Sequence, residues 1–398
     1  MDALMLPLNW QRVRLGDVAE IIGGGTPSTQ ITSFWNGSIN WFTPTEIGIT
    51  KYVYKSQRTI TPLGLKKSSA KLLPIGTILL TSRASIGDCA ILKVVATTNQ
   101  GFQSLIPLEK INNEFLYYLI LTLKNKLLKL ASGSTFLEVS PNKIKNLPIP
   151  LPPLNEQIAI ANILSDLDRY LCSLDALILK KEGVKKALSF ELLSQRKRLK
   201  GFNQNWQRVR LGDVAEIIGG GTPSTQITSF WNGSINWFTP TEIGITKYVY
   251  KSQRTITPLG LKKSSAKLLP IGTILLTSRA SIGDCAILKV VATTNQGFQS
   301  LIPLEKINNE FLYYLILTLK NKLLKLASGS TFLEVSPNKI KNLPIPLPPL
   351  NEQIAIANIL SDLDSEIISL KNKKRQFENI KKALNHDLMS AKIRVLKE

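Results

Sequence analysis

The chain has 398 residues, and 43% of them are hydrophobic, so it is long enough for two domains of ordinary size with their own cores. It carries 50 Lys and Arg against 28 Asp and Glu, a net charge of +22 that favours a polyanionic partner, nucleic acid first. Three cysteines exclude a disulfide framework and favour a reducing cytoplasm. No long apolar span, lipidation motif or secretory signal is visible, so we expect no membrane association.

An exact internal duplication organises the chain. Residues Asn9 to Asp168 recur without change as Asn205 to Asp364, at an offset of 196. Solenoid repeats have periods of roughly 20 to 50 residues, so these are two duplicate domains and not units of an array. His386 is the only histidine and lies outside both copies, so neither copy can hold a histidine-based triad or a histidine-ligated metal.

Within the first copy, Trp10 to Leu15 predicts a short strand, and residues 16 to 22 predict the start of a helix. Residues 23 to 44 are rich in Gly, Thr, Ser and Asn and predict a loop. Residues 74–81 and 89–95 predict two strands of a hairpin whose polar tip, residues 82–88, contains one arginine. A polar turn follows at residues 97–103.

Apolar residues keep a helical period from Asn113 to Ala131, which predicts one helix, and residues 141–143 predict a short helical turn. Residues 147–153 predict an extended, proline-rich bridge. From about residues 155 and 351 onward, leucines spaced by three and four predict two long helices with narrow apolar seams. Such helices pair with each other, and we expect an antiparallel coiled coil. An antiparallel pair has a two-fold axis across its length, which would place the copies at opposite ends and present two inverted half-sites to duplex DNA.

The chain lacks several catalytic signatures. It contains no Asp/Glu-x-Lys triplet of metal-dependent nucleases, no Gly-Lys dipeptide of a phosphate-binding loop, and no Asn/Asp-Pro-Pro-aromatic motif for amino-methylation of a flipped base. We therefore expect a protein with no catalytic residue, no metal and no cofactor of its own.

A series of motifs carries, in order, a resemblance to a known family. They are Gly23-Gly-Gly-Thr-Pro-Ser, Phe34-Trp35 with Ile39-Asn-Trp41, Thr43-Pro-Thr-Glu-Ile-Gly48, Leu79-Leu-Thr-Ser-Arg-Ala-Ser-Ile-Gly87, Thr98-Asn-Gln-Gly-Phe102, Gly133-Ser-Thr-Phe-Leu-Glu-Val139 and Ile149-Pro-Leu-Pro-Pro-Leu-Asn-Glu-Gln157. The chain resembles the specificity subunits of Type I restriction-modification systems. The resemblance implies duplicated α/β (α+β) target recognition domains and a pseudo-two-fold architecture. We expect the recognition domains to span residues 1–154 and 205–350 and the spacer helices to span residues 155–204 and 351–398.

The resemblance also implies partners. They are double-stranded DNA, two modification (methyltransferase) subunits and restriction (translocase/nuclease) subunits, in the cytoplasm. S-adenosylmethionine, adenine methylation and ATP-driven cleavage belong to those partners. Family members usually carry two different recognition domains, whereas these copies are identical, so a bipartite palindrome is expected instead of an asymmetric site. The alternative is a stand-alone DNA-binding regulator without methyltransferase partners; a bifunctional nuclease is disfavoured by the missing carboxylate-lysine motif.

Candidate DNA contacts come from the polar loops. Arg83 at the hairpin tip is the best base or phosphate contact, because arginine is the commonest bidentate partner of guanine, although it could instead tie loops together. Asn99, Gln100 and Gln103 suit adenine edges or an ordinary turn; Thr26, Ser28, Ser82, Ser134 and Thr135 suit phosphate or loop capping, and Lys143 suits phosphate or solvent. The second copy repeats the set as Thr222, Ser224, Ser278, Arg279, Asn295, Gln296, Gln299, Ser330, Thr331 and Lys339.

Overall fold

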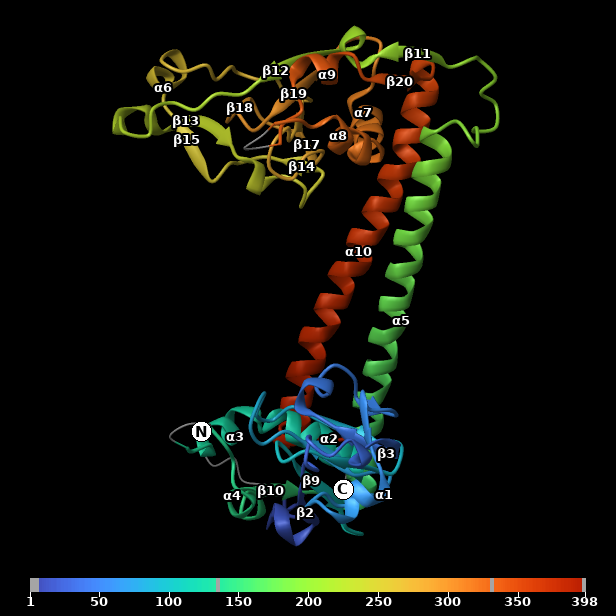
Figure 1. The fold of residues 1–398 in the computed structure, drawn as a ribbon, viewed down its shortest axis with the longest axis vertical. Helices are drawn as coiled ribbons and strands as arrows, with labels where there is room; N and C mark the ends of the chain where they lie inside the picture. Colours follow the sequence, from blue (N-terminus) through green and yellow to red (C-terminus); the bar gives the residue numbers. More distant parts are fainter. Residues whose placement is uncertain (1–6, 134–136, 330–332, 396–398) are drawn as a thin grey trace. The chain divides into compact units, whose positions relative to one another are not determined.

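The computed structural model describes residues 7–133, 137–329 and 333–395, and its contacts divide the chain into two compact units. Unit 1 comprises residues 1–175 and 372–398, and unit 2 comprises residues 176–371. Each unit therefore contains one copy of the repeat with the first part of its own long helix and the last part of the other (Figure 1). The fold class is a duplicated mixed α/β domain with two long helices, as predicted.

The bounds of the elements repeat at the offset of 196. In unit 1 they are β1 Gln11–Arg14, β2 Ala19–Gly23, β3 Trp35–Phe42, β4 Tyr52–Val53, β5 Arg58–Ile60, α1 Pro62–Lys66, β6 Ile78–Leu80, β7 Cys89–Leu92, β8 Ala96–Thr98, β9 Gln103–Pro107, α2 Asn113–Thr122, α3 Lys124–Leu130, α4 Pro141–Lys145 and β10 Pro148–Leu151. In unit 2 they are β11 Gln207–Arg210, β12 Ala215–Gly219, β13 Trp231–Phe238, β14 Tyr248–Val249, β15 Arg254–Ile256, α6 Pro258–Lys262, β16 Ile274–Leu276, β17 Cys285–Leu288, β18 Ala292–Thr294, β19 Gln299–Pro303, α7 Asn309–Thr318, α8 Lys320–Leu326, α9 Pro337–Lys341 and β20 Pro344–Leu347. The long helices are α5 Leu154–Leu193 and α10 Leu350–Met389.

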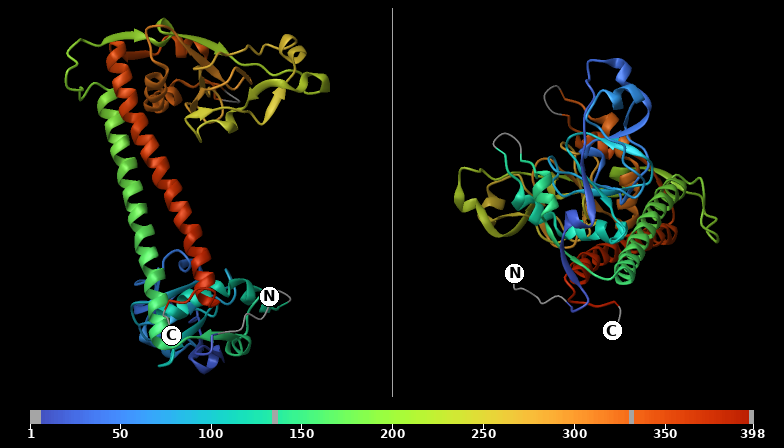
Figure 2. Two further views of the ribbon diagram at one scale, coloured as in Figure 1. Left: turned by 180° about the vertical axis from the view of Figure 1, so that it is seen from behind. Right: turned by 90° about the horizontal axis from the view of Figure 1, so that it is seen from below.

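Three sheets build each copy. In unit 1 a five-stranded sheet has the order β2-β9-β6-β7-β4, a three-stranded sheet has the order β5-β3-β8, and β1 pairs with β10. The larger core packs the five-stranded sheet against α2 and the start of α5, and Leu388 and Met389 of α10 complete it. In unit 2, β13, β15 and α6 lie on the side of the five-stranded sheet away from the long helices (Figures 1 and 2).

The hairpin and the long helices were predicted correctly, whereas the predicted helix at residues 16–22 is wrong. A 3-10 turn at Leu15–Asp17 leads directly into β2, where Ile21 pairs with Leu105 of β9. The predicted loop at 23–44 contains strand β3, and the extended bridge contains β10, which pairs with β1. The predicted helix 113–131 is two helices, because Leu123 has a ψ of 0° between α2 and α3.

Within each unit the two helix segments run antiparallel. In unit 1, Asp168 pairs with Lys381 and Asp175 with Lys374 (2.6 Å), so the partner number falls as the α5 number rises. In unit 2, Lys181 bonds Glu366 at 2.8 Å and Lys185 pairs with Asp364 in the same sense. The expectation of antiparallel pairing is therefore met inside each unit.

A polar cluster joins the recognition copy to its helix. In unit 1, Lys51 Nζ donates to Tyr118 (2.9 Å) and Ser165 (2.8 Å) and pairs with Glu114, while Tyr118 donates to Asp168. Burial lowers the pKa of Lys51, and Glu114 opposes that shift. Burial likewise raises the pKa of the Tyr118 hydroxyl, so it stays protonated and acts as a donor to Asp168.

Candidate functional site

In the first copy, two tryptophans of β3 hold the glycine loop, residues 23–28, in place. Trp41 Nε1 donates to Gly25 O at 2.8 Å, and Trp35 Nε1 donates to Ser28 O at 3.0 Å. The two indole rings meet edge to face, with centroids 5.0 Å apart. The loop backbone is therefore fixed by β3, and the side chains of Thr26 and Ser28 remain exposed.

The polar turn after β8 packs against this loop. Gly25 N donates to Thr98 O at 2.9 Å, and the side-chain oxygen of Asn99 accepts from Gly101 N at 2.8 Å. The exposed Gln100 accepts a hydrogen bond from Thr26. Asn99 thus uses its oxygen to stabilise the turn, whereas Gln100 presents an amide to solvent beside the glycine loop.

The contact between loop and turn depends on Gly24. A Cβ there would lie 1.9 Å from Asn99 O, whereas a Cβ at the preceding Gly23 would meet nothing nearer than 3.6 Å. We expect Gly24→Ala with Gly220→Ala to separate the loop from the turn and to cost on the order of 1–3 kcal/mol per copy. Gly23→Ala with Gly219→Ala is the matched control and should be much milder. Thermal unfolding measures both; equal shifts would show that the close approach is unimportant.

The hairpin tip adjoins the same turn. Ser82 is fully buried, and both its N–H (2.8 Å) and its hydroxyl (3.2 Å) donate to Gly101 O. Arg83 Nε pairs with Glu138 at 3.0 Å, and 41% of the arginine side chain is exposed. Within the described residues the terminal amino groups of Arg83 donate no hydrogen bond, so they are available to an outside acceptor.

Gln103 is the first residue of β9 and is buried, so it is not part of the exposed loop surface. Only 6% of the residue is exposed, and its Oε1 has no hydrogen-bond partner among the residues that the structure describes. The hydroxyl of the neighbouring Ser104 is equally unpaired within that part of the chain. Ser82 and Gln103 are thus interior members of the predicted set.

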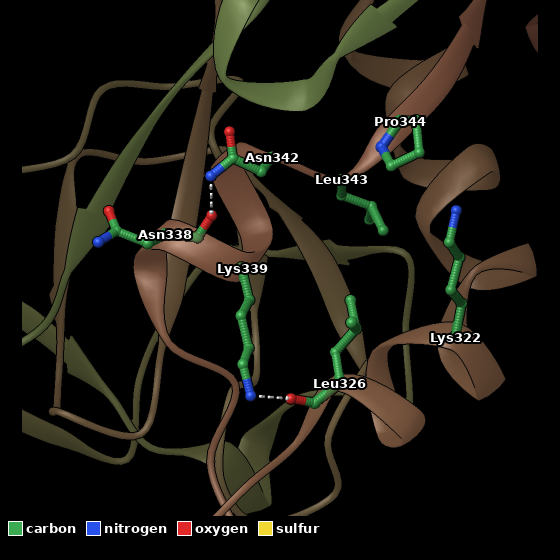
Figure 3. A pocket seen from close by; sticks show the side chains of 7 residues that line it. All are labelled: Lys322, Leu326, Asn338, Lys339, Asn342, Leu343 and Pro344. Atoms are coloured by element: carbon green, nitrogen blue, oxygen red, sulfur yellow. Dashed lines mark hydrogen bonds between the residues drawn. The ribbon is translucent and has the colours of Figure 1, made fainter.

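Lys143 and its copy Lys339 have internal acceptors. Lys339 Nζ donates to Leu326 O (2.8 Å) and Ser328 Oγ (2.9 Å), at a cavity of about 320 Å³ between α8, α9 and β20 (Figure 3). Lys143 donates to Ser132 Oγ in the same way, and the backbone of Ser132 forms a β-bridge with Glu138, the partner of Arg83. Lys143 is therefore linked to Arg83 through Ser132 and Glu138.

The structure brings some of the predicted residues together and buries others. Thr26, Ser28, Asn99, Gln100 and Arg83 lie on three loops that bond one another, and unit 2 repeats the arrangement with Thr222, Ser224, Asn295, Gln296 and Arg279. Ser278 and Gln299 are buried like Ser82 and Gln103. The predictions for Ser134, Thr135, Ser330 and Thr331 fall outside the described residues.

Sequence reasoning missed two residues. Glu138 lies in the motif Gly133–Val139, but nothing in the sequence indicated that it pairs with Arg83, because 55 residues separate the two. Arg58 stacks on Trp35, and its signal was present in the sequence as a long stretch without any carboxylate.

Within residues 7–133, 137–329 and 333–395, no group of three or more His, Cys, Asp or Glu side chains is placed to hold a metal ion. The helices in the same ranges include none long and apolar enough to cross a membrane.

Comparison with known proteins gives concordant matches. Residues 7–181 and 203–379 match the family described as the Type I restriction modification DNA specificity domain. The chain is 29% identical over 414 residues to the specificity subunit of the type I restriction enzyme MjaIX from Methanocaldococcus jannaschii, covering 99% of this chain and 96% of that protein. It is 34% identical over 233 residues to the EcoR124I/EcoR124II specificity subunit from Escherichia coli, covering 56% of each.

Solved structures share the fold. The HsdS subunit from Thermoanaerobacter tengcongensis aligns with a TM-score of 0.59 at 21% identity, over 98% of this chain and 99% of that one. The S subunit of a Type I restriction-modification system from M. genitalium aligns with a TM-score of 0.59 at 19% identity, over 97% of both chains.

Proposed function

Since the chain belongs to the family of Type I restriction-modification DNA specificity subunits, we propose that its two identical copies read a bipartite palindromic site. Each half would consist of a few base pairs, with a non-specific spacer of roughly one helical turn between the halves. The exact duplication carries this proposal, because two readers with the same residues recognise the same bases.

The two units repeat one contact at the ends of the long helices. Glu156 pairs with Arg394 in unit 1, and Glu352 pairs with Arg198 in unit 2. Each unit therefore joins the start of one long helix to the segment that follows the other, with the roles of the two helices exchanged. The proposed inverted half-sites assume that the two copies read DNA in opposite directions.

The three bonded loops are the proposed DNA-reading surface. Gln100 and Arg83, with Gln296 and Arg279, offer exposed amide and guanidinium groups suited to base edges. Thr26 and Ser28 with their copies offer hydroxyls suited to phosphate. The division into recognition domains 1–154 and 205–350 and spacer helices 155–204 and 351–398 belongs to the same proposal.

We further propose that the chain is non-catalytic and cytoplasmic and acts with two modification subunits and with restriction subunits, which supply methylation and ATP-dependent cleavage. Copurification tests this part: the chain should retain a partner that binds S-adenosylmethionine, at two per chain. Purification without such a partner from cells that express the neighbouring genes would favour the stand-alone regulator.

Methylome sequencing of a host that carries the system tests the palindrome. We expect one methylated motif whose halves are reverse complements of each other, because both copies read the same bases. A motif with unrelated halves would refute the symmetry argument and leave the family membership untouched.

A further inference from the structure

Each copy contains a long stretch of chain without carboxylates. Between Glu46 and Asp88 there is no Asp or Glu, but there are seven Lys and Arg residues, and the stretch recurs between Glu242 and Asp284. Five of the seven, Lys55, Arg58, Lys66, Lys67 and Lys71, fall on or beside the three-stranded sheet and α1. We refer to these five residues as the basic strip.

The other two cations of this carboxylate-free stretch each have a carboxylate partner from outside it. Lys51 pairs with Glu114 and Arg83 pairs with Glu138. All five residues of the basic strip are exposed, and none forms an ion pair with any residue in the described part of the chain. The strip therefore keeps its positive charge for a partner that the chain does not supply.

Among the described contacts, Arg58 is the member of the strip that stacks on aromatic rings. Its guanidinium carbon lies 3.7 Å from the centroid of the Trp35 ring and 5.5 Å from that of Trp41. Arg254 repeats the stack on Trp231 at 3.8 Å. Stacking occupies one face of the guanidinium, whereas its N–H donors point outward in its own plane. Among described residues nothing accepts from those donors.

The stack is continuous with the proposed reading surface. Trp35 donates a hydrogen bond to Ser28 O, and Trp41 donates one to Gly25 O. The two tryptophans on which Arg58 stacks, here called the tryptophan platform, therefore also fix the glycine loop. The lysines lie on segments packed on that platform: α1 places Leu65 against it, and the backbone of Ser69 and Ala70 abuts Gly25. Arg58 is thus an exposed cation held by stacking beside the proposed reading loops. This position suits an extended anionic partner that lies along those loops.

We propose that Arg58 and Arg254 bind backbone phosphates of the DNA duplex, as the fixed points of a basic strip that sets the position of each copy along the DNA. The inference rests on the proposed function and deepens it. It separates two roles within one copy: the tryptophan-stacked Arg58 binds phosphate irrespective of sequence, and the loop residues read bases.

Binding of the full chain to a fluorescent duplex of arbitrary sequence, measured between about 50 and 200 mM salt, tests the phosphate role. Each phosphate contact contributes about 0.9 to the slope of log Kd against log salt concentration. Arg58→Ala with Arg254→Ala should therefore reduce the slope by about 2 and weaken binding to specific and arbitrary duplexes alike. Arg58→Lys with Arg254→Lys keeps the charge and should retain most of the slope.

Arg12→Ala with Arg208→Ala is the matched control, because these exposed arginines lie on β1 and β11, in a different sheet. An equal change of slope in this control would assign the effect to diffuse net charge and overturn the proposal. A loss confined to the methylated motif would make Arg58 a base reader and also overturn it. A wild-type chain that binds no duplex would refute the proposed function itself, whereas wild-type binding with an unchanged slope in the variant refutes only this inference.

Discussion

Replacing Arg198 with alanine should destabilise unit 2 by about 3 kcal/mol, the cost of stranding a buried charge. The carboxylate of Glu352 has no exposed surface, and it accepts from Arg198 at 2.9 Å and from Trp206 Nε1 at 2.9 Å. Without Arg198 only the neutral indole N–H remains of these two donors. Arg198 follows α5, whereas Glu352 opens α10, so the loss also weakens the attachment of the second helix segment.

Urea unfolding measures the change, and the chain provides its own controls. Replacing both partners, Arg198→Met with Glu352→Gln, removes the stranded charge and should recover most of the stability. Unit 1 holds the equivalent pair, Arg394 with Glu156, at 2.9 Å, so Arg394→Ala should give a similar loss there. Losses under about 1 kcal/mol in both single variants would place these pairs with ordinary surface salt bridges.

The sequence predicted the elements whose signal is long. Leucines and other apolar residues recur at helical spacing along most of α5 and α10, which are 40 residues each, and helices of that length have few competing interpretations. Short elements failed for the opposite reason. Val18, Ile21 and Ile22 have helical spacing, but the segment pairs with β9, and pairing with a strand more than 80 residues away leaves no local trace.

The β3 strand was missed because its stability comes from specific contacts and not from a hydrophobic period. Asn36 has a φ of 61°, and Gly37 lies so close to Ile60 O that a Cβ would approach it to 2.5 Å. Both features interrupt the alternation that marks a strand. The tryptophans that hold the strand in place bond loop carbonyls, which composition alone cannot assign.

The candidate site was predictable as a set of loops but not as a set of roles. Polarity and turn composition selected Ser82 and Gln103, yet the fold buries both, because Ser82 is needed to hold Gly101 across a separation of 19 residues. Arg58 is the opposite case, because the residues around it in sequence offered no reason to select it over the nearby lysines. Only its stacking on Trp35 distinguishes it from the surface lysines. Solvent exposure and stacking are properties of the folded chain, so residue type could not separate these cases.

Arg83→Ala and Arg279→Ala, made singly, should each relax one half of the DNA motif. Each should lose about 1–3 kcal/mol of specific binding, the value of a bidentate arginine contact with guanine, while binding to arbitrary duplex changes little. Because the two copies are identical and the proposed site is palindromic, the single variants should give one and the same methylated motif, with one half intact. The double variant should relax both halves.

Binding to specific and arbitrary duplexes across a salt series, combined with methylome sequencing, measures these outcomes. Arg14→Ala is the matched control, because Arg14 is another exposed arginine paired with a carboxylate, Asp17, on β1. Equal losses on specific and arbitrary DNA would reassign Arg83 to phosphate or to structure, as Glu138 already permits. Different motifs from the two single variants would show that the identical copies are not used equivalently. In that case the parts of the chain outside the repeat, where Tyr170 packs on Phe377 in unit 1 but Lys181 pairs with Glu366 in unit 2, must impose an asymmetry on the complex.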